Sequence, residues 1–231
     1  MKKSNKILFG GFLTLILLVT GIHISLYAKY NSGHYTVYQP GGKDKLPPMQ
    51  SFPNVPVVII RNSNAVISFG DSLSAEKGKE KFIQYVQQGD SLLIMPRNEK
   101  EGFRNRGPVK LILPYNISLS AYNSSISFEK GKGNAMANPS IYLYNSDAIF
   151  AFSAKPIRLG HVKINASENS NAVFHRSIQI DHLDVQLKNS SIEDEAGDIA
   201  QLSIATDSTS QLILQSKHLL KATITSIPNN P

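Results

Sequence analysis

The sequence predicts an all-β fold, a single-stranded parallel β-helix (β-solenoid), placed after one N-terminal transmembrane helix. Pairs of Asn or Asp with Ser recur about every 20 residues, a spacing typical of solenoids. On both sides of these pairs apolar residues alternate with polar ones, which is the period of a β-strand. The N-terminal segment differs from the rest, because it holds a long apolar run without a charged side chain.

The N-terminal segment predicts a membrane anchor. Residues 1–6 form a short basic tail, and residues 7–28 are a run of 22 residues without a charged side chain. As a helix this run would extend about 33 Å, enough to cross a hydrocarbon core of about 30 Å. A cleaved secretory signal is the alternative, but cleavage after Ala28 would place Leu26 where a small residue is required. We therefore expect an uncleaved signal anchor at residues 7–28.

The lysines around the apolar run predict its orientation. Lys2, Lys3 and Lys6 precede the run and Lys29 follows it, so the basic tail is expected in the cytoplasm. The protein would then cross the bacterial inner (plasma) membrane once, with its C-terminal domain outside the cytoplasm, in the periplasm. Residues 29–51 contain paired glycines and paired prolines and are expected to be a tether. The folded domain is expected to span residues 52–231.

The repeat predicts how this domain is built. The last apolar residue before each pair and the first one after it are usually five positions apart, so a single straight strand could not bury both. Asn tolerates a left-handed backbone and Ser bonds to nearby backbone, so each pair predicts a corner between two strands. The pairs are Asn62-Ser63, Asn123-Ser124, Asn145-Ser146, Asn169-Ser170, Asn189-Ser190 and Asp207-Ser208.

Stacking such units would bury one continuous core and align the corners into an asparagine ladder. The copies at Asn169 and Asp207 have one more residue before the pair, which predicts a bulge or a longer corner. In the last copy Ser210 stands in place of an apolar residue, as expected near a terminal cap. An antiparallel sandwich is the alternative architecture, since it also consists of short strands at regular spacing.

The 61 residues that separate the first two pairs predict a different element. Residues 81–86 and 91–94 have strand composition and flank a Gly-Asp turn, which predicts a β-hairpin. A further strand at residues 109–114 is expected to begin the main run of repeats.

Composition excludes several classes of function. The chain has no cysteine, which excludes disulfide frameworks, zinc-thiolate sites, iron–sulfur clusters and cysteine nucleophiles. The net charge of +7 arises in residues 1–130, which hold 16 Lys and Arg against 8 Asp and Glu. The basic cluster from Lys77 to Arg106 alternates with glutamates and no nucleic-acid-binding motif accompanies it, so we expect no nucleic-acid partner.

Several stretches of the sequence resemble a known family. The opening segment SFPNVPVVIIRNSNAVISFGD, the hairpin VQQGDSLLI and the units LDVQLKNSSI and LSIATDSTSQLIL are similar to the autotransporter-adhesin head GIN domain family of Bacteroidetes envelope proteins. The resemblance covers about residues 51–225. It implies a right-handed β-solenoid on the cell envelope and supplies no catalytic residues. Corners in that family are often Gly-Ser-Gly, whereas Asn-Ser dominates here.

Three tyrosines are the candidate ligand-facing residues. Alignment on the corners places Tyr122 and Tyr144 at the same outward position of consecutive units, with Tyr142 on the same face. Such a cluster can form a flat platform for sugar rings, and it can equally be ordinary cross-strand packing.

Two ionisable segments are expected to be solvated. Segment 181–184 contains Asp, His and Asp, but no second histidine follows at the spacing of a metal site. The acidic segment 193–198 lacks the glycine-rich repeat of calcium-binding β-rolls and is expected to be a solvated corner. We therefore expect no metal, no cofactor and no catalytic residue.

Two functional hypotheses remain. We favour a non-enzymatic, membrane-anchored envelope protein whose solenoid presents a binding or adhesion surface to an envelope glycan or protein. The alternative is a carbohydrate-active enzyme, a polysaccharide lyase or glycosidase on a β-helix, whose paired carboxyl groups could come only from residues 181–198. No hydrolase elbow, phosphate loop or zinc-protease motif supports an enzyme. A third role, as an accessory subunit of a membrane complex, is left open.

Overall fold

The computed structural model describes residues 9, 11–20, 47–98, 107–131, 135–150 and 156–228. The chain divides into two compact units, Met1–Lys45 and Leu46–Pro231. In the first unit the described residues 9 and 11–20 are helical. Within the described part of the chain, no helix is both long and apolar enough to span a membrane. The rest of the expected anchor at 7–28, the tail 1–6 and most of the tether 29–51 lie outside the described residues.

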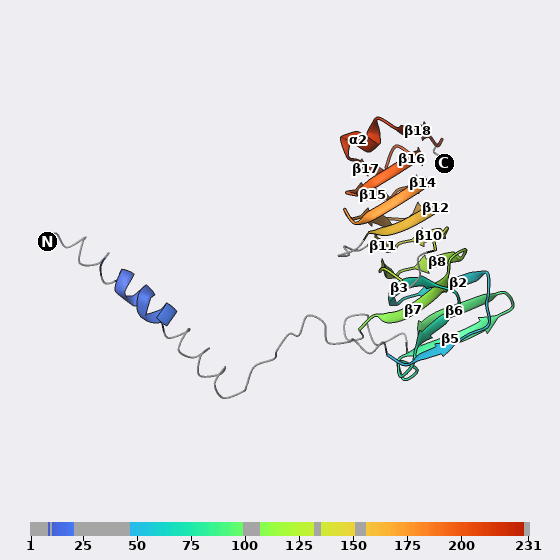
Figure 1. The fold of residues 1–231 in the computed structure, drawn as a ribbon, viewed down its shortest axis with the longest axis horizontal. Coiled ribbons are helices and arrows are strands. Elements are labelled where there is room, and N and C mark those ends of the chain that lie inside the picture. The colour runs from blue at the N-terminus through green and yellow to red at the C-terminus, as the bar shows by residue number, and fades with distance from the viewer. Residues whose placement is uncertain are drawn as a thin grey trace. The chain divides into compact units, whose positions relative to one another are not determined.

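The second unit consists of two sheets and one short helix, α2 (Ser216–Leu219) (Figure 1). Sheet A has the strand order β1-β4-β7-β3-β9-β11-β13-β15-β17, and sheet B has the order β18-β16-β14-β12-β10-β8-β2-β6-β5. The strands are β1 (Met49–Ser51), β2 (Val57–Arg61), β3 (Asn64–Gly70), β4 (Ser74–Glu76), β5 (Ile83–Gln88), β6 (Ser91–Pro96), β7 (Val109–Pro114), β8 (Ser118–Tyr122), β9 (Ser125–Phe128), β10 (Ser140–Tyr144), β11 (Asp147–Phe150), β12 (Ile157–Ser167), β13 (Asn171–Phe174), β14 (Ile178–Lys188), β15 (Ser191–Asp194), β16 (Asp198–Thr206), β17 (Gln211–Ile213) and β18 (Ala222–Ser226).

The predicted β-solenoid is confirmed. Five consecutive coils, from β8–β9 to β16–β17, each place one strand in sheet B and the next in sheet A. Every strand pairs in parallel with the equivalent strand of the next coil, as in the register of Ile141 with Leu119 and with Ile164. An antiparallel sandwich is excluded, because antiparallel pairing in the described part of the chain is confined to β1–β4, β4–β7 and β5–β6 at one end of the sheets.

The 61-residue stretch forms that end of the solenoid. The expected hairpin is confirmed, since β5 and β6 pair antiparallel around a turn in which Gly89 has a φ of 54°. β6 then pairs in parallel with β2, and β7 pairs in parallel with β3. The first Asn-Ser unit, β2–β3, therefore lies between this stretch and β8–β9, so the coils are not stacked in the order of the sequence (Figure 1). β1 lies within residues 29–51, so strand pairing begins before residue 52.

The Asn residues turn the chain at the corners, as predicted. Asn62, Asn123, Asn145 and Asn189 have φ between 46° and 49°, in the left-handed region. Their amides form part of a ladder, with Asn145 Nδ2 donating to Asn123 Oδ1 at 2.8 Å. At the fourth corner both Glu168 and Asn169 have positive φ, so the extra residue lengthens the corner as expected.

A second ladder, of buried serines, runs inside the corners. The Ser124 backbone N–H donates to Ser146 Oγ at 3.0 Å, and the Ser146 N–H donates to Ser170 Oγ at 3.1 Å. The ladder ends where the Ser190 N–H donates to Ser210 Oγ at 3.2 Å. Ser210 is therefore the corner serine of the last coil, equivalent to Ser190. The expectation that Ser210 replaces an apolar residue is wrong, because this corner is longer than the pair Asp207-Ser208 predicts.

The core is a column of apolar side chains with an aromatic stack at its centre. Phe150 lies 4.4 Å from the ring centroids of both Phe128 and Phe174, with nearly parallel planes. The position after Phe174 in this column belongs to Asp194, which is paired in register with it. A carboxyl group thus replaces the next phenylalanine at the C-terminal end.

Candidate functional site

The three candidate tyrosines lie together on the outer face of sheet B. Tyr122 ends β8 and Tyr144 ends β10, and the two are directly paired in register. Arg61 is the residue paired with Tyr122 on its other side. Tyr142 points outward two residues before Tyr144, because side chains alternate along a strand. The three tyrosines therefore lie on one face of sheet B, as the alignment of the corners predicts.

The rings form a cluster but not a single plane. Tyr122 lies 5.8 Å from the centroid of Tyr142 and 6.1 Å from that of Tyr144, with interplanar angles of 52° and 38°. The Arg61 guanidinium carbon lies 5.3 Å from the Tyr122 centroid, within the range of a cation–π contact. Tyr122 is half-buried by these neighbours, whereas Tyr142 is 37% and Tyr144 41% exposed. The rings therefore do not form the flat platform considered above. Tyr142 and Tyr144 nevertheless remain partly exposed to solvent.

Polar side chains continue this face toward the C-terminal end. Asn165 is paired with Tyr142, and Gln186 is paired with Asn165, so amides follow the tyrosines along the solenoid. Beside them a shallow hollow of about 290 Å³ is lined by residues that include Lys163, Asp184 and Thr225. The face thus combines open aromatic rings with hydrogen-bond donors and acceptors.

One histidine of sheet B, His161, pairs with an aspartate. His161 Nε2 lies 2.6 Å from Asp184 Oδ2, and both side chains are close to half exposed. The ring of His182 lies 5.6 Å from that of His161. Within the described ranges, no group of three or more His, Asp or Glu residues is arranged to hold a metal ion.

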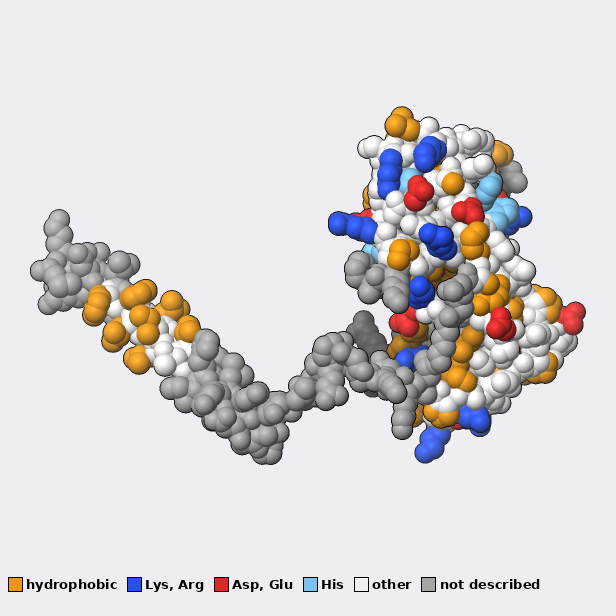
Figure 2. All heavy atoms as spheres, in the orientation of Figure 1, with side chains coloured by type: hydrophobic (Ala, Val, Ile, Leu, Met, Phe, Trp, Pro, Cys, Tyr) orange, Lys and Arg blue, Asp and Glu red, His pale blue; other side chains and the backbone are white. Residues whose placement is uncertain are grey.

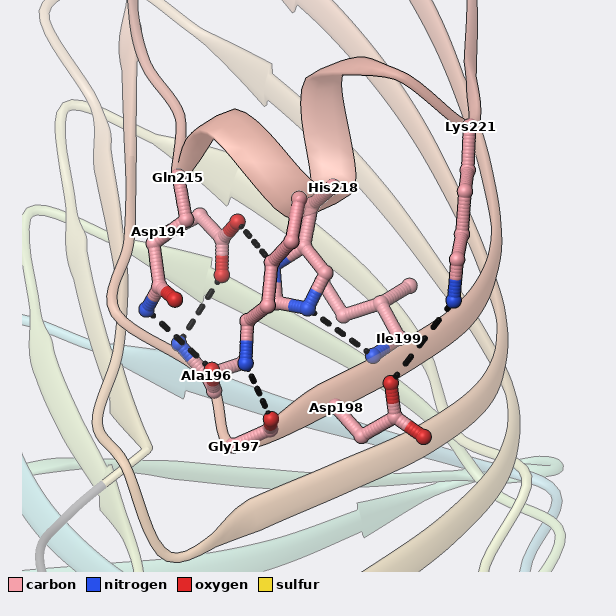
Figure 3. Close-up of polar contacts among 9 residues, drawn as sticks. Asp194, Ala196, Gly197, Asp198, Ile199, Gln215, His218 and Lys221 are labelled. Carbon is pink, nitrogen blue, oxygen red and sulfur yellow. Dashed lines mark hydrogen bonds and ion pairs between the residues drawn. The ribbon is translucent and has the colours of Figure 1, made fainter.

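A buried pair at the C-terminal end is the most enclosed polar group described. His218 Nδ1 lies 2.6 Å from Asp194 Oδ2, and neither side chain has any exposed surface. His218 Nε2 accepts the backbone N–H of Ile199 at 3.2 Å, and Asp194 Oδ1 accepts the N–H of Ala196 at 2.9 Å. Figure 3 shows the imidazole between the two partners. Because both ring nitrogens are engaged and no solvent reaches them, the pair has a structural role and cannot activate a nucleophile.

This pair also changes the interpretation of the acidic segment 193–198. Asp194 is inside the core, so the expectation of a solvated corner is wrong at this residue. Asp198 lies at the surface, 4.0 Å from Lys221 Nζ, and Glu195 lies 3.8 Å from His175. The side chains of Gln215 and Lys217 donate to the carbonyls of Ala196 and Gly197 and hold α2 to the end of the coil (Figure 3).

Three residues outside the tyrosine cluster have shifted pKa values. Partial burial on the outer face of sheet A raises the pKa of Asp147 above its ordinary value. Burial, with Glu80 and Glu76 nearby, raises the pKa of Tyr85 to about 12. The Ser210 hydroxyl, which donates to Asp207 at 2.5 Å, lowers the pKa of that carboxyl.

Two hollows of about 380 and 340 Å³ share Phe69, Tyr115 and Glu129 in their lining, and the larger one extends to Leu159 in β12. Their lining does not extend to the tyrosine cluster.

Sequence reasoning missed the Asp194–His218 pair, although one signal was present. Five residues after Asn123, Asn145 and Asn169 stand Phe128, Phe150 and Phe174, and the same count from Asn189 gives Asp194. An acidic residue in an apolar position predicts a buried partner. Nothing in the repeat identifies that partner as His218, because His218 lies after the last coil.

Comparison with known proteins finds a distant likeness to a solved structure. No protein-family model matches the sequence, and no curated protein matches it. A crystal structure described as that of a "putative adhesin" from Parabacteroides merdae ATCC 43184 is similar over 78% of this chain and 74% of that chain. The TM-score is 0.40 and the identity is 11%. A likeness this distant supports no inference about family or ligand, and the resemblance to the GIN family stays a prediction.

Proposed function

We propose that this protein is a non-enzymatic, membrane-anchored envelope protein that binds an envelope glycan on the outer face of sheet B. The observation that carries the proposal is the cluster of Tyr122, Tyr142 and Tyr144, in which two rings remain open to solvent at the end of a polar face. Clustered aromatic rings either contribute to a core or mark a binding surface. Here the core beneath the tyrosines is already filled by their buried neighbours Ala121 and Leu143, which favours a binding surface.

A glycan fits the chemistry of this face. A sugar ring offers an apolar face that can lie on Tyr142 or Tyr144, and its hydroxyls can bond to the amides of Asn165 and Gln186. These groups follow one another along the solenoid at the strand spacing of about 4.8 Å. An extended chain that lies along the solenoid axis would therefore contact a new coil with each sugar. A protein partner is the other ligand class that such a face could take.

The membrane anchor in this proposal is supported by the sequence. Residues 7–28 form an uncharged apolar run preceded by three lysines, which favours a helix in the inner membrane with the solenoid in the periplasm. Protease added to spheroplasts of cells that carry the full chain should then digest the solenoid. Protection of the solenoid from that protease would overturn this localisation.

An enzyme is disfavoured by the fate of the carboxyl groups that it would need. Asp194 is buried against His218, Asp184 is paired with His161 on sheet B, and Glu193 lies on sheet A. These three carboxyl groups of segment 181–198 thus do not lie together on one face of the solenoid. Glycosidase chemistry needs two carboxyl groups about 5–10 Å apart at one bond.

The proposal is tested with the full chain in non-ionic detergent, mixed with insoluble envelope polysaccharide and sedimented. Tyr142→Ser and Tyr144→Ser should each reduce the amount of protein in the pellet. The matched control is Ile149→Ser, which changes an outward residue of the same coil on sheet A. New reducing ends in the supernatant would overturn the non-enzymatic proposal and show that the protein cleaves the polysaccharide. Equal pelleting of all four proteins would show that the tyrosines serve only as cross-strand packing.

A further inference from the structure

At the C-terminal end of sheet B, one strand has no second neighbour among the described residues. β18 pairs in parallel with β16 and lies last in the strand order, at the end opposite to β5 (Figure 1). Its sequence, ATITS, contains no charged residue and no proline. Charged residues and prolines usually protect an edge strand from pairing with another chain, and β18 has neither.

Apolar side chains are exposed around this edge. Leu220, just before β18, is 89% exposed, Leu219 is 51% exposed and Ile224 is 44% exposed. Figure 2 shows hydrophobic side chains at this end of the solenoid. Ile224 is paired with the buried Ile204, so it faces the core side of the sheet and is exposed only because no further coil covers it.

The backbone of β18 is arranged to accept another strand. The Ile227 N–H donates to the Thr206 carbonyl at 2.8 Å, which orients Thr223 and Thr225 toward β16 as well. Successive residues point to opposite edges, so the N–H and C=O groups of Ala222, Ile224 and Ser226 point to the open edge.

The strand is also complementary to itself. In an antiparallel pair centred on Ile224, that residue lies opposite its own copy, and Thr223 lies opposite Thr225 of the second chain. Ala222 lies opposite Ser226, so small residues meet at both ends. Thr–Thr and β-branched pairs are favourable across strands. The two-fold axis would be perpendicular to the sheet, so both copies would keep their core faces on the same side.

We propose that β18 is a self-association site at which two copies of this chain join tip to tip by antiparallel pairing. The occupant is a second copy, because the same residues on both sides complete every cross-strand pair. Pairing would cover Ile224 and satisfy the open backbone groups of Ala222, Ile224 and Ser226. The joined tips would lie at the end of sheet B that is opposite to β5. This proposal does not depend on the ligand proposed above.

Single cysteines test the register, since the natural chain contains none. Thr223 and the second chain's Thr225 would form a pair without direct hydrogen bonds, in which side chains approach closely enough for a disulfide. Full-length Thr223→Cys and Thr225→Cys proteins are mixed in non-ionic detergent and treated with diamide, which takes up the two thiol hydrogens as the S–S bond forms. We expect a disulfide-linked dimer in the mixture and its loss in either variant alone, because identical positions lie too far apart.

A proline variant supplies the control. Ser226→Pro removes an N–H that points to the open edge and leaves the bonds to β16 in place, whereas Ser226→Ala keeps that N–H. Introduced into both cysteine variants, Ser226→Pro should abolish the dimer and Ser226→Ala should preserve it, with unchanged circular dichroism. A monomeric native chain in light scattering together with no disulfide in the mixture would overturn the proposal. Equal disulfide formation in the separate variants would overturn it too, because it would indicate random collision.

Discussion

Replacement of His218 by alanine is the sharpest test of how the C-terminal end is held. The change leaves the Asp194 carboxyl buried without its partner at 2.6 Å and leaves the Ile199 N–H without its acceptor at 3.2 Å. Removal of one member of a buried pair costs about 3–5 kcal/mol. The unsatisfied Ile199 N–H is part of this loss, since a buried donor without an acceptor by itself costs about 1–3 kcal/mol.

This penalty need not fall on the whole solenoid. Coils contact only their neighbours, so α2 and β18 can detach and let water reach Asp194. We therefore expect His218→Ala to lower the free energy of opening of α2, β18 and the start of β16 by about 3–5 kcal/mol. The coils from β8 to β13 should keep their protection. Native-state hydrogen exchange read by mass spectrometry measures both regions in one experiment.

Two further variants decide whether the pair is the cause. Asp194→Leu with His218→Leu removes both polar groups, so the double variant should lose less stability than the sum of the two single variants. Lys217→Ala, which removes an exposed donor to Gly197, is the matched control in α2 and should change protection by about 1 kcal/mol or less. Additive losses in the double variant, or uniform loss over all coils, would refute the reasoning.

The remaining predictions concern the corners and one carboxyl group. Ser146→Ala leaves the buried Ser124 N–H without its acceptor and should cost about 1–3 kcal/mol in urea unfolding, whereas Ser63→Ala should cost almost nothing, because Ser63 Oγ has no partner among the described residues. Asn145→Ala places an alanine at a φ of 46° and should cost about 1–2 kcal/mol, and Asn145→Gly should cost less; equal losses would argue against a backbone cause. The raised pKa of Asp147 means that its ionised form disfavours the fold, so its contribution to stability is present at acid pH and is lost as the pH rises through the raised pKa. Asp147→Asn should therefore be more stable than the natural chain at pH 7 and equally stable below pH 3.8, and a constant difference across that range would contradict burial as the cause.

Local pattern was sufficient to predict the repeating unit. Alternation of apolar residues fixes which side chains of a strand face the core, and an odd spacing across Asn-Ser requires a bend, so strands, corners and the tyrosine face followed from short-range rules. The hairpin β5–β6 could also be predicted from the sequence, since its turn and both strands lie within one short segment.

Tertiary structure decided what depends on contacts between distant segments. The sequence by itself determined a solenoid with Asn-Ser corners and three outward tyrosines. It did not determine that β6 and β7 lie beneath β2 and β3, because a strand in a parallel stack can pair with either neighbour and the pattern is the same for both. Nor did it reveal that Asp194 is buried, because only the docking of α2 from beyond the last coil supplies His218 as its partner. A periodic pattern encodes which face of a strand is buried, and it leaves open which segment covers the end.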